Sequence, residues 1–190
     1  MPETLSEAGI EAAALSLGCD VASIKAVAEV ESRGQGFLPN GQLKILFEGH
    51  IFFKYTHGAF AAQHPTICYP HWTRQFYLGG VREWDRMNEA LALDHDAALM
   101  SASYGKFQIM GFNFVHCGFT SVDAFVTSLQ TGEDAHLQAF CAYIKDVGLA
   151  RNLTLHRWAD FAQGYNGPEY RKNQYDLNLQ KAYIKYADAG

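Results

Sequence analysis

The sequence has no long apolar segment and no run of basic residues. Its 190 residues include 15 Lys and Arg against 20 Asp and Glu, which gives a formal net charge of -5. Because a nucleic-acid-binding protein needs clustered positive charge, we expect no nucleic-acid partner. No stretch of the chain approaches the ~20 consecutive apolar residues that span a bilayer, so the sequence predicts no transmembrane helix.

Cysteine is scarce and scattered. No two of the four cysteines form a C-x-x-C pair, and they stand at Cys19, Cys68, Cys117 and Cys141. Zinc sites and disulfide scaffolds need closer and more regular spacing, so we expect reduced and mostly buried thiols. The sequence also lacks an H-E-x-x-H motif, and prolines and a glycine interrupt the seven-residue spacing of His50, His57, His64 and His71. We therefore expect no metal and no organic cofactor.

The N-terminus lacks the features of a secretory signal. It is acidic, and it has neither a basic region nor a continuous apolar core. The stretch TLSEAGIEAAALSLG instead favours a helix over residues 4–17 that ends at Gly18. We expect the chain to stay in the cytoplasm of the cell that makes it until something else releases it.

What the sequence does contain is ample material for a core. Hydrophobic residues make up 48% of the chain, with 13 Phe, 10 Tyr and 3 Trp, which is enough to fill a core and line a groove. No linker, repeat or low-complexity segment interrupts it, and its length suits one domain. We predict a single domain over residues 1–190, and we expect it to be a monomer.

The hydrophobic spacing predicts an α+β fold that is predominantly α-helical, with a small β element early in the chain. Helices are expected over about 4–17, 20–34, 82–100, 121–129, 133–147, 156–163 and 174–187. Alternating Leu43, Ile45 and Phe47 predict a short strand, and residues 51–55 fit a helix or a strand. Residues 57–80 contain several Gly and Pro and no period, so we expect a long irregular segment there, with substrate contact as its function.

Two glutamates lie one residue apart in AEVESRG, on different faces of the predicted helix 20–34. Glu29 shares a face with Lys25 and Arg33, which is the spacing of solvated ion pairs on a helix surface. Glu31 continues the apolar face instead. A carboxylate in a half-buried place is costly unless it is paired, hydrogen-bonded or protonated, and a raised pKa suits a general acid. The alternative for Glu31 is a partly exposed residue at a helix end.

Three short motifs follow one another along the chain: ES at 31–32, YGKFQIMG at 104–111 and GYNGPEY at 164–170. In this order they resemble the signature of the lysozyme-like superfamily, which includes goose-type lysozymes and lytic transglycosylases. The sequence is more similar still to the N-acetylmuramidase family of phage and prophage endolysins, through VASIKAVAEVESRGQGFL, KILFEGHIFF, SASYGKFQIMGFN and FAQGYNGPEYRKNQYD. The resemblance implies a lysozyme-like fold and a hydrolase that cuts the β-1,4 bond between N-acetylmuramic acid and N-acetylglucosamine in peptidoglycan.

The resemblance also implies roles for single residues. It makes Glu31 the general acid, places Gln108 on the sugar groove and places the Tyr165 hydroxyl near the catalytic carboxylate. Asn166, Ser32 and Met110, in the same motifs, are assigned to substrate binding, although Met110 and Tyr165 also fit a packing role. The chain departs from the pattern at Gly49, Lys106 and Gly164.

We expect the second catalytic carboxylate to be Glu48. It ends an apolar run, where a charged side chain is costly unless it has a partner or a function. An inverting glycosidase needs a base that activates water on the far side of the sugar, and a retaining one needs a nucleophile. The alternative for Glu48 is a structural ion pair or a capping carboxylate. If only Glu31 acts, the sugar's own 6-hydroxyl can attack, which is the lytic transglycosylase reaction with a 1,6-anhydro product.

Two further interpretations stay open at this point. An inactive peptidoglycan-binding or virion structural module would keep the groove but would not need Glu31. The C-terminal segment 170–186 carries four Lys and Arg beside several apolar residues, so it either packs as a terminal helix or makes weak contact with anionic envelope lipids. We expect a separate pore-forming protein to admit the enzyme to the periplasm and the cell wall.

Overall fold

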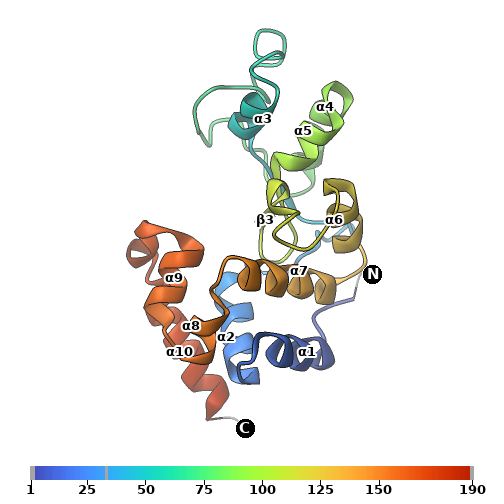
Figure 1. The fold of residues 1–190 in the computed structure, drawn as a ribbon. Helices are drawn as coiled ribbons and strands as arrows, with labels where there is room; N and C mark the ends of the chain where they lie inside the picture. Colours follow the sequence, from blue (N-terminus) through green and yellow to red (C-terminus); the bar gives the residue numbers. More distant parts are fainter. Residues whose placement is uncertain (1–2, 33, 189–190) are drawn as a thin grey trace.

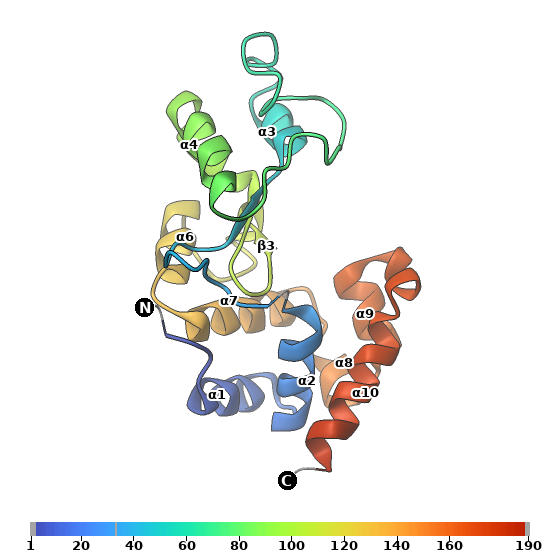
Figure 2. The same cartoon turned by 180° about the vertical axis from the view of Figure 1, so that it is seen from behind.

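The computed structural model describes residues 3–32 and 34–188 and divides them into a lower and an upper lobe (Figure 1). The lower lobe is made of helices from both ends of the chain, and residues 49–100 form the upper lobe. Figure 2 shows the same division from behind, with the β-strands running from one lobe to the other. Arg33, one of the residues predicted to share a face with Glu29, lies outside the described residues.

The lower lobe begins with α1 (Glu7–Leu17) and α2 (Val21–Glu31). Ser6 and Asp20 cap them by accepting hydrogen bonds from the backbone N–H groups of Gly9 and Ser23. Helix α1 ends at Gly18, as predicted, in the left-handed conformation with φ 67°. Helix α2 was predicted to reach Gly34 but ends at Glu31, because Ser32 is already extended.

The rest of the lower lobe comes from the second half of the chain. Its elements are α6 (Val122–Leu129), α7 (Glu133–Asp146), α8 (Ala150–Thr154), α9 (Trp158–Asn166), η3 (Pro168–Asn173) and α10 (Tyr175–Ala187). Helix α7 crosses the middle of the molecule above α1, and α9 and α10 stand beside α2 (Figure 1). The prediction missed α8 and η3 and placed the other helices within a few residues of their bounds.

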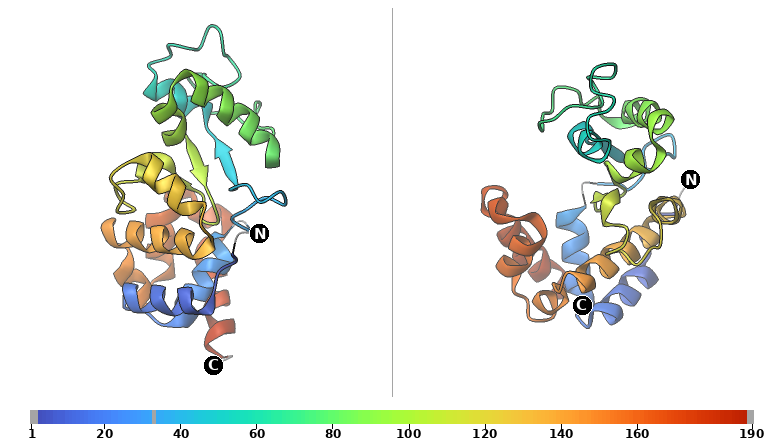
Figure 3. Two further views of the ribbon diagram at one scale, coloured as in Figure 1. Left: turned by 90° about the vertical axis from the view of Figure 1, so that its right-hand side faces the viewer. Right: turned by 45° about the horizontal axis from the view of Figure 1, so that its top comes forward.

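The upper lobe holds the long irregular segment that the sequence predicts at 57–80. Around it lie α3 (Gly49–Tyr55), η1 (Gly80–Arg82), α4 (Glu83–Leu93) and α5 (His95–Met100). One helix was expected over 82–100, but Asp94 is extended and its carboxylate caps α5 by accepting from Ala97 N–H at 3.0 Å. Figure 3 shows that the irregular segment forms the end of the lobe farthest from α1.

A three-stranded antiparallel sheet connects the lobes, with strand order β1-β2-β3. Its strands are β1 (Ile45–Phe47), β2 (Ala102–Tyr104) and β3 (Ile109–Met110), followed by the turn η2 (Gly111–Asn113). Ile45 pairs with Tyr104 and Phe47 with Ala102, and all four are buried. The early β element was therefore predicted correctly, but the hairpin that completes the sheet was not.

Helix α10 packs on α2 and α9 with Leu179 and Ala182 fully buried. Its Lys185 Nζ lies 2.6 Å from Glu29 Oε2, so Glu29 is an exposed ion-pair residue as predicted, although its partner is on another helix. The C-terminal segment is thus a packed terminal helix, and contact with anionic lipids stays a prediction.

The cysteines are free thiols, three of them buried and Cys19 partly exposed, as predicted. No helix within the described ranges is long and apolar enough to cross a bilayer.

Candidate active site

A groove of about 390 Å³ opens where the sheet meets α2, α7, α9 and α10. It brings together most of the residues that the sequence assigned to the site. They are Glu31, Glu48, Gln108, Met110, Tyr165 and Asn166, and Val30, Leu46, Ser103, Phe107, Ile109, Asn113, Tyr143 and Tyr175 complete the lining. The volume suits a ligand of sugar size.

Glu31 is the last residue of α2, and it is buried with 7% of its surface exposed. Its neighbours on the helix, Val27 and Ala28, are buried in the core, so the apolar face predicted for this helix ends in the carboxylate. Asn166, the last residue of α9, donates from Nδ2 to Glu31 Oε1 at 2.9 Å. The ends of two helices far apart in sequence therefore meet at this carboxylate.

Tyr165 lies beside that pair and is locked by packing. Its ring stacks on Phe161 and meets Phe140 edge to face, and its hydroxyl donates to the Phe107 carbonyl at 3.3 Å. Burial and, next, the charge of Glu31 raise the pKa of the Tyr165 hydroxyl well above its ordinary value. It stays neutral near Glu31, as predicted, but it also has the packing role that was the alternative.

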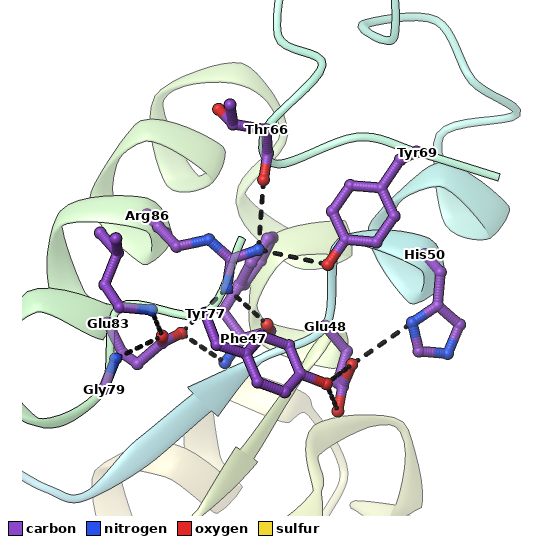
Figure 4. A network of polar contacts seen from close by, with 10 residues as sticks. Phe47, Glu48, His50, Thr66, Tyr69, Tyr77, Gly79, Glu83 and Arg86 are labelled. Carbon is purple, nitrogen blue, oxygen red and sulfur yellow. Dashed lines mark hydrogen bonds and ion pairs between the residues drawn. The ribbon is translucent and has the colours of Figure 1, made fainter. Parts of the chain in front are cut away.

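Glu48 directly follows β1, lines the same groove and is mostly buried, with 14% of its side chain exposed. The Tyr77 hydroxyl donates to both carboxylate oxygens, at 2.8 and 2.7 Å (Figure 4). His50 Nδ1 lies 3.3 Å from Oε2. Glu48 precedes α3, but it makes no side-chain capping hydrogen bond there, so the capping interpretation is wrong.

One row of side chains across the sheet lines the groove that also holds the two carboxylates. Leu46 pairs in register with Ser103, and Ser103 pairs with Met110. All three line the groove, and so does Ile109, the neighbour of Met110 in β3. Met110 is therefore a groove residue, half-buried at the end of this row.

Gln108 is held in an unusual backbone conformation with φ 51°, which non-glycine residues rarely adopt. Both ends of its amide are tied to the β2–β3 hairpin. Ser103 Oγ donates to Oε1 at 3.0 Å, and Nε2 donates to the Gly105 carbonyl at 2.9 Å. The amide is therefore fixed at the edge of the groove by the hairpin itself, and sugar binding by Gln108 stays a prediction.

Comparison with known proteins agrees with this arrangement. The model of one protein family, described as N-acetylmuramidase, matches residues 20–187. The chain belongs to the N-acetylmuramidase family. It is a glycoside hydrolase that acts on peptidoglycan. The comparison with curated protein sequences gave no match.

Among solved structures, the chain is similar to the crystal structure of Burkholderia AP3 phage endolysin. The TM-score is 0.92 and the sequence identity is 37%, over 100% of this chain and 73% of that chain. The lysozyme-like α+β fold expected from the motifs is thereby confirmed.

Ser32 does not share the groove with the other predicted site residues of this N-acetylmuramidase family member. It lies just beyond the end of α2, in a separate surface hollow with Glu29 and Lys106. Substrate binding by Ser32 is therefore not supported by its position. The ES motif places one residue in the groove and the next outside it.

The three departures from the family pattern have structural reasons. Lys106 turns away from the groove, and its Nζ lies 3.0 Å from the buried Glu133 carboxylate. A Cβ at Gly49 would lie 2.3 Å from Tyr69 Cε1, and one at Gly164 would lie 2.4 Å from a methyl group of Leu149. None of the three changes the lining of the groove.

Several groove residues were missed. Asn113, Tyr143 and Tyr175 line it from η2, α7 and α10, and only the fold brings them together. Ser103 had a detectable sign, because it is the polar residue between two apolar ones in A-S-Y. Among the described residues, the group best placed for a metal is His95, Asp96 and Asp123, but all three are exposed and none lines the groove.

Proposed function

We propose that this chain is an endolysin-type muramidase that hydrolyses the β-1,4 bond between N-acetylmuramic acid and N-acetylglucosamine, with Glu31 as the general acid. The observation that carries the proposal is the place of Glu31. A mostly buried carboxylate at the end of an apolar helix opens onto a sugar-sized groove, where Asn166 holds one of its oxygens. The family match and the likeness to a phage endolysin supply the substrate class.

The reaction needs an acid because the glycosidic oxygen is a poor leaving group. Protonated Glu31 would donate its proton to that oxygen as the bond from the muramic acid C1 breaks. Asn166 hydrogen-bonds the acid, and the neighbouring Tyr165 stays neutral. The leaving N-acetylglucosamine then regains its 4-hydroxyl.

Glu48 is the proposed base. An ionised carboxylate accepts hydrogen bonds only, which matches a side chain whose two oxygens accept from Tyr77. From its place in the groove it would take a proton from the water that attacks C1. The product would be a free reducing muramic acid.

One observation favours a lytic transglycosylase instead. The Tyr77 hydroxyl already occupies both oxygens of Glu48, as it would if Glu48 were purely structural. Glu31 would then act first as acid and next as base on the substrate's 6-hydroxyl. The product would be a 1,6-anhydro sugar.

Mass spectrometry of the fragments released from purified Gram-negative peptidoglycan, with and without borohydride reduction, separates these reactions. Free reducing muramic acid ends are the expected result. Fragments lighter by one water and resistant to reduction would establish the transglycosylase, and reducing N-acetylglucosamine ends would move the cut to the other bond.

Replacing Glu31 with Gln tests its role. The amide keeps the shape of the side chain but cannot donate the acidic proton, so we expect cleavage to be lost while binding of glycan fragments persists. Asn166 remains able to hydrogen-bond the variant side chain, which preserves the local packing. Lytic activity at the wild-type level would remove Glu31 from the mechanism.

We also infer, from the likeness to a phage endolysin, that a separate pore-forming protein admits the enzyme to the cell wall. Dye leakage from liposomes tests this inference. The purified chain should release no dye, and leakage caused by the chain alone would contradict it.

A further inference from the structure

Glu48 is not held by its own helix but by a segment almost thirty residues further along the chain. Tyr77 belongs to the irregular stretch 57–80, and its hydroxyl lies 2.8 and 2.7 Å from the two Glu48 oxygens. Burial, and next the hydrogen bond to Glu48, raise the pKa of the Tyr77 hydroxyl, so it remains a donor at neutral pH. The segment lacks the regular hydrogen bonds of a helix or sheet, so something else must fix Tyr77.

A buried ion pair at the start of α4 provides that fixation. Glu83 and Arg86 have 1% and 5% of their side chains exposed, and Arg86 Nη1 lies 3.0 Å from Glu83 Oε2. Glu83 also accepts from the backbone N–H groups of Leu78 and Gly79, at 2.6 and 2.9 Å. These are the two residues that follow Tyr77 in the sequence.

The same pair is anchored to the strand that carries Glu48. Glu83 Oε2 accepts from the Phe47 N–H at 3.3 Å, and Arg86 Nη1 donates to the Phe47 carbonyl at 2.9 Å. The Arg86 guanidinium also lies over the Tyr77 ring, 5.8 Å from its centroid. Figure 4 shows the consequence: Glu83 accepts from the backbone after Tyr77 on one side, and the ion pair contacts Phe47, the residue before Glu48, on the other.

Tyr77 does not itself line the groove, but its hydroxyl is bonded to Glu48, which does. We propose that Tyr77 is the positioning residue of Glu48, held by the Glu83–Arg86 pair so that the carboxylate keeps one orientation toward the groove. The proposal rests on the proposed function, in which Glu48 activates the attacking water. Tyr77 acts through Glu48 and does not touch the substrate.

Steady-state kinetics on peptidoglycan test this with Tyr77→Phe, Glu48→Gln and the double variant. Tyr77→Phe keeps the ring under Arg86 and removes only the hydroxyl, so we expect kcat to fall about tenfold with KM within twofold. Glu48→Gln should lower kcat by roughly 10²–10³-fold. In the Glu48→Gln background, Tyr77→Phe should change kcat less than twofold, because the carboxylate base that Tyr77 orients is absent.

Tyr69→Phe is the matched control. Its hydroxyl accepts from Arg86 Nη2 at 3.4 Å in the same network, but no hydrogen bond connects it to Glu48. We expect wild-type kcat and KM for this variant. A decrease in kcat equal to that of Tyr77→Phe would show that any weakening of the network lowers activity. That result would overturn the positioning role of Tyr77.

The outcomes separate the two claims. If Glu48→Gln retains wild-type kcat, the proposed role of Glu48 fails, and the positioning role fails with it. If Glu48→Gln is impaired but Tyr77→Phe lowers kcat equally in both backgrounds, only the positioning role fails. A rise in KM alone would make Tyr77 a substrate contact and would also overturn it.

A crystal structure of the Tyr77→Phe enzyme gives a second readout that does not depend on residual activity. We expect the Glu48 carboxylate to adopt a different rotamer or more than one, while Phe47 and α4 stay in place. A Glu48 side chain unchanged from the wild-type orientation would overturn the proposal.

Discussion

The side-chain amide of Asn166 donates a hydrogen bond of 2.9 Å to Glu31 Oε1, so the last residue of α9 holds the last residue of α2. The two residues are 135 positions apart in the sequence. The contact therefore depends on the packing of α9 and α10 against α2. Its position at the proposed acid leads to the first prediction.

Replacing Asn166 with Ala should lower kcat about fivefold and leave KM nearly unchanged. A net hydrogen bond is worth about 1 kcal/mol, and about 1.4 kcal/mol of activation free energy is a tenfold change in rate. We expect the effect on kcat because the amide hydrogen-bonds the acid, whereas a rise in KM would support the substrate-binding role predicted for Asn166. Steady-state kinetics on peptidoglycan provide the measurement.

Asn178→Ala is the control for that variant, because Asn178 is exposed on α10 and makes no contact with Glu31 in the described part of the chain. It should keep wild-type kinetics. A normal kcat in Asn166→Ala would contradict an orienting role for the amide.

Replacing Glu83 with Gln should destabilise the fold. Breaking one partner of a buried ion pair costs about 3–5 kcal/mol, and Gln would also present an amide NH2 where Glu83 now accepts from Phe47, Leu78 and Gly79. At roughly 2–4 °C per kcal/mol for a chain of this size, Tm should fall by about 6–20 °C. Differential scanning calorimetry of the variant and the wild type measures this change in Tm.

Glu169→Gln serves as the comparison, since the Glu169–Lys172 pair is 65% and 75% exposed. Exposed pairs contribute little, so its Tm should match the wild type within error. An equal decrease in Tm for the two variants would mean that the buried Glu83–Arg86 pair stabilises the fold no more than an exposed pair does.

The elements that the sequence predicted well are those whose information is local. The end of α1 at Gly18 and the start of α2 after Asp20 were predicted from their caps, whereas α1 was predicted to begin at residue 4 and begins at Glu7, after the N-cap Ser6. The break at Asp94 was missed although Asp is a good N-cap residue, because apolar residues continue through it. An N-cap residue such as Asp94 therefore marks a boundary between two helices even where the apolar pattern continues through it.

What the sequence could not supply was pairing between distant or very short segments. Strands β2 and β3 have three and two residues, too few to show alternation. Their hairpin turns through Gln108 at φ 51°, a residue type that does not indicate such a turn. Glu31 was found from its helix face and its motif, but Tyr77 comes from a segment with no period, so its contact with Glu48 had no local sign.

Replacing Gly49 with Ala should destabilise the protein, although Ala favours helices. The new Cβ would lie 2.3 Å from Tyr69 Cε1 and 2.7 Å from the Ile67 carbonyl oxygen. The second contact is backbone and cannot move away freely, so we expect a loss of about 1–3 kcal/mol in the free energy of unfolding. Urea unfolding followed by circular dichroism provides the measurement.

Gly164→Ala is the matched control because it too is a helical glycine where the family pattern has another residue. Its Cβ would meet only the side chain of Leu149, with a methyl group at 2.4 Å, and that side chain can rotate. Helix propensity gains up to ~1 kcal/mol on Gly→Ala, so this variant should be near neutral. A destabilised Gly164→Ala with an unaffected Gly49→Ala would contradict the packing argument.

The stability of the protein should fall as the pH drops below about 6.5, and His136 is one cause. His136 is buried between Leu129, whose carbonyl lies 2.7 Å from Nε2, and Lys106, whose backbone N–H donates to Nδ1 at 3.1 Å. Burial lowers its pKa from the ordinary 6.5, against the opposing effects of the hydrogen bond to the Leu129 carbonyl and then the charge of Glu133. The neutral ring is therefore the form that fits the fold.

Below pH 6.5 His136 is protonated in the unfolded chain but stays neutral in the folded chain. The free energy of unfolding therefore decreases with falling pH until the pH reaches the lowered pKa of His136 in the folded state. His136→Gln keeps one donor and one acceptor but does not titrate. Its Tm should therefore change less than that of the wild type between pH 7 and pH 5, as measured by calorimetry at several pH values. Parallel Tm curves for the two proteins would assign the acid sensitivity to other groups, because only the wild type has a titrating ring at this position.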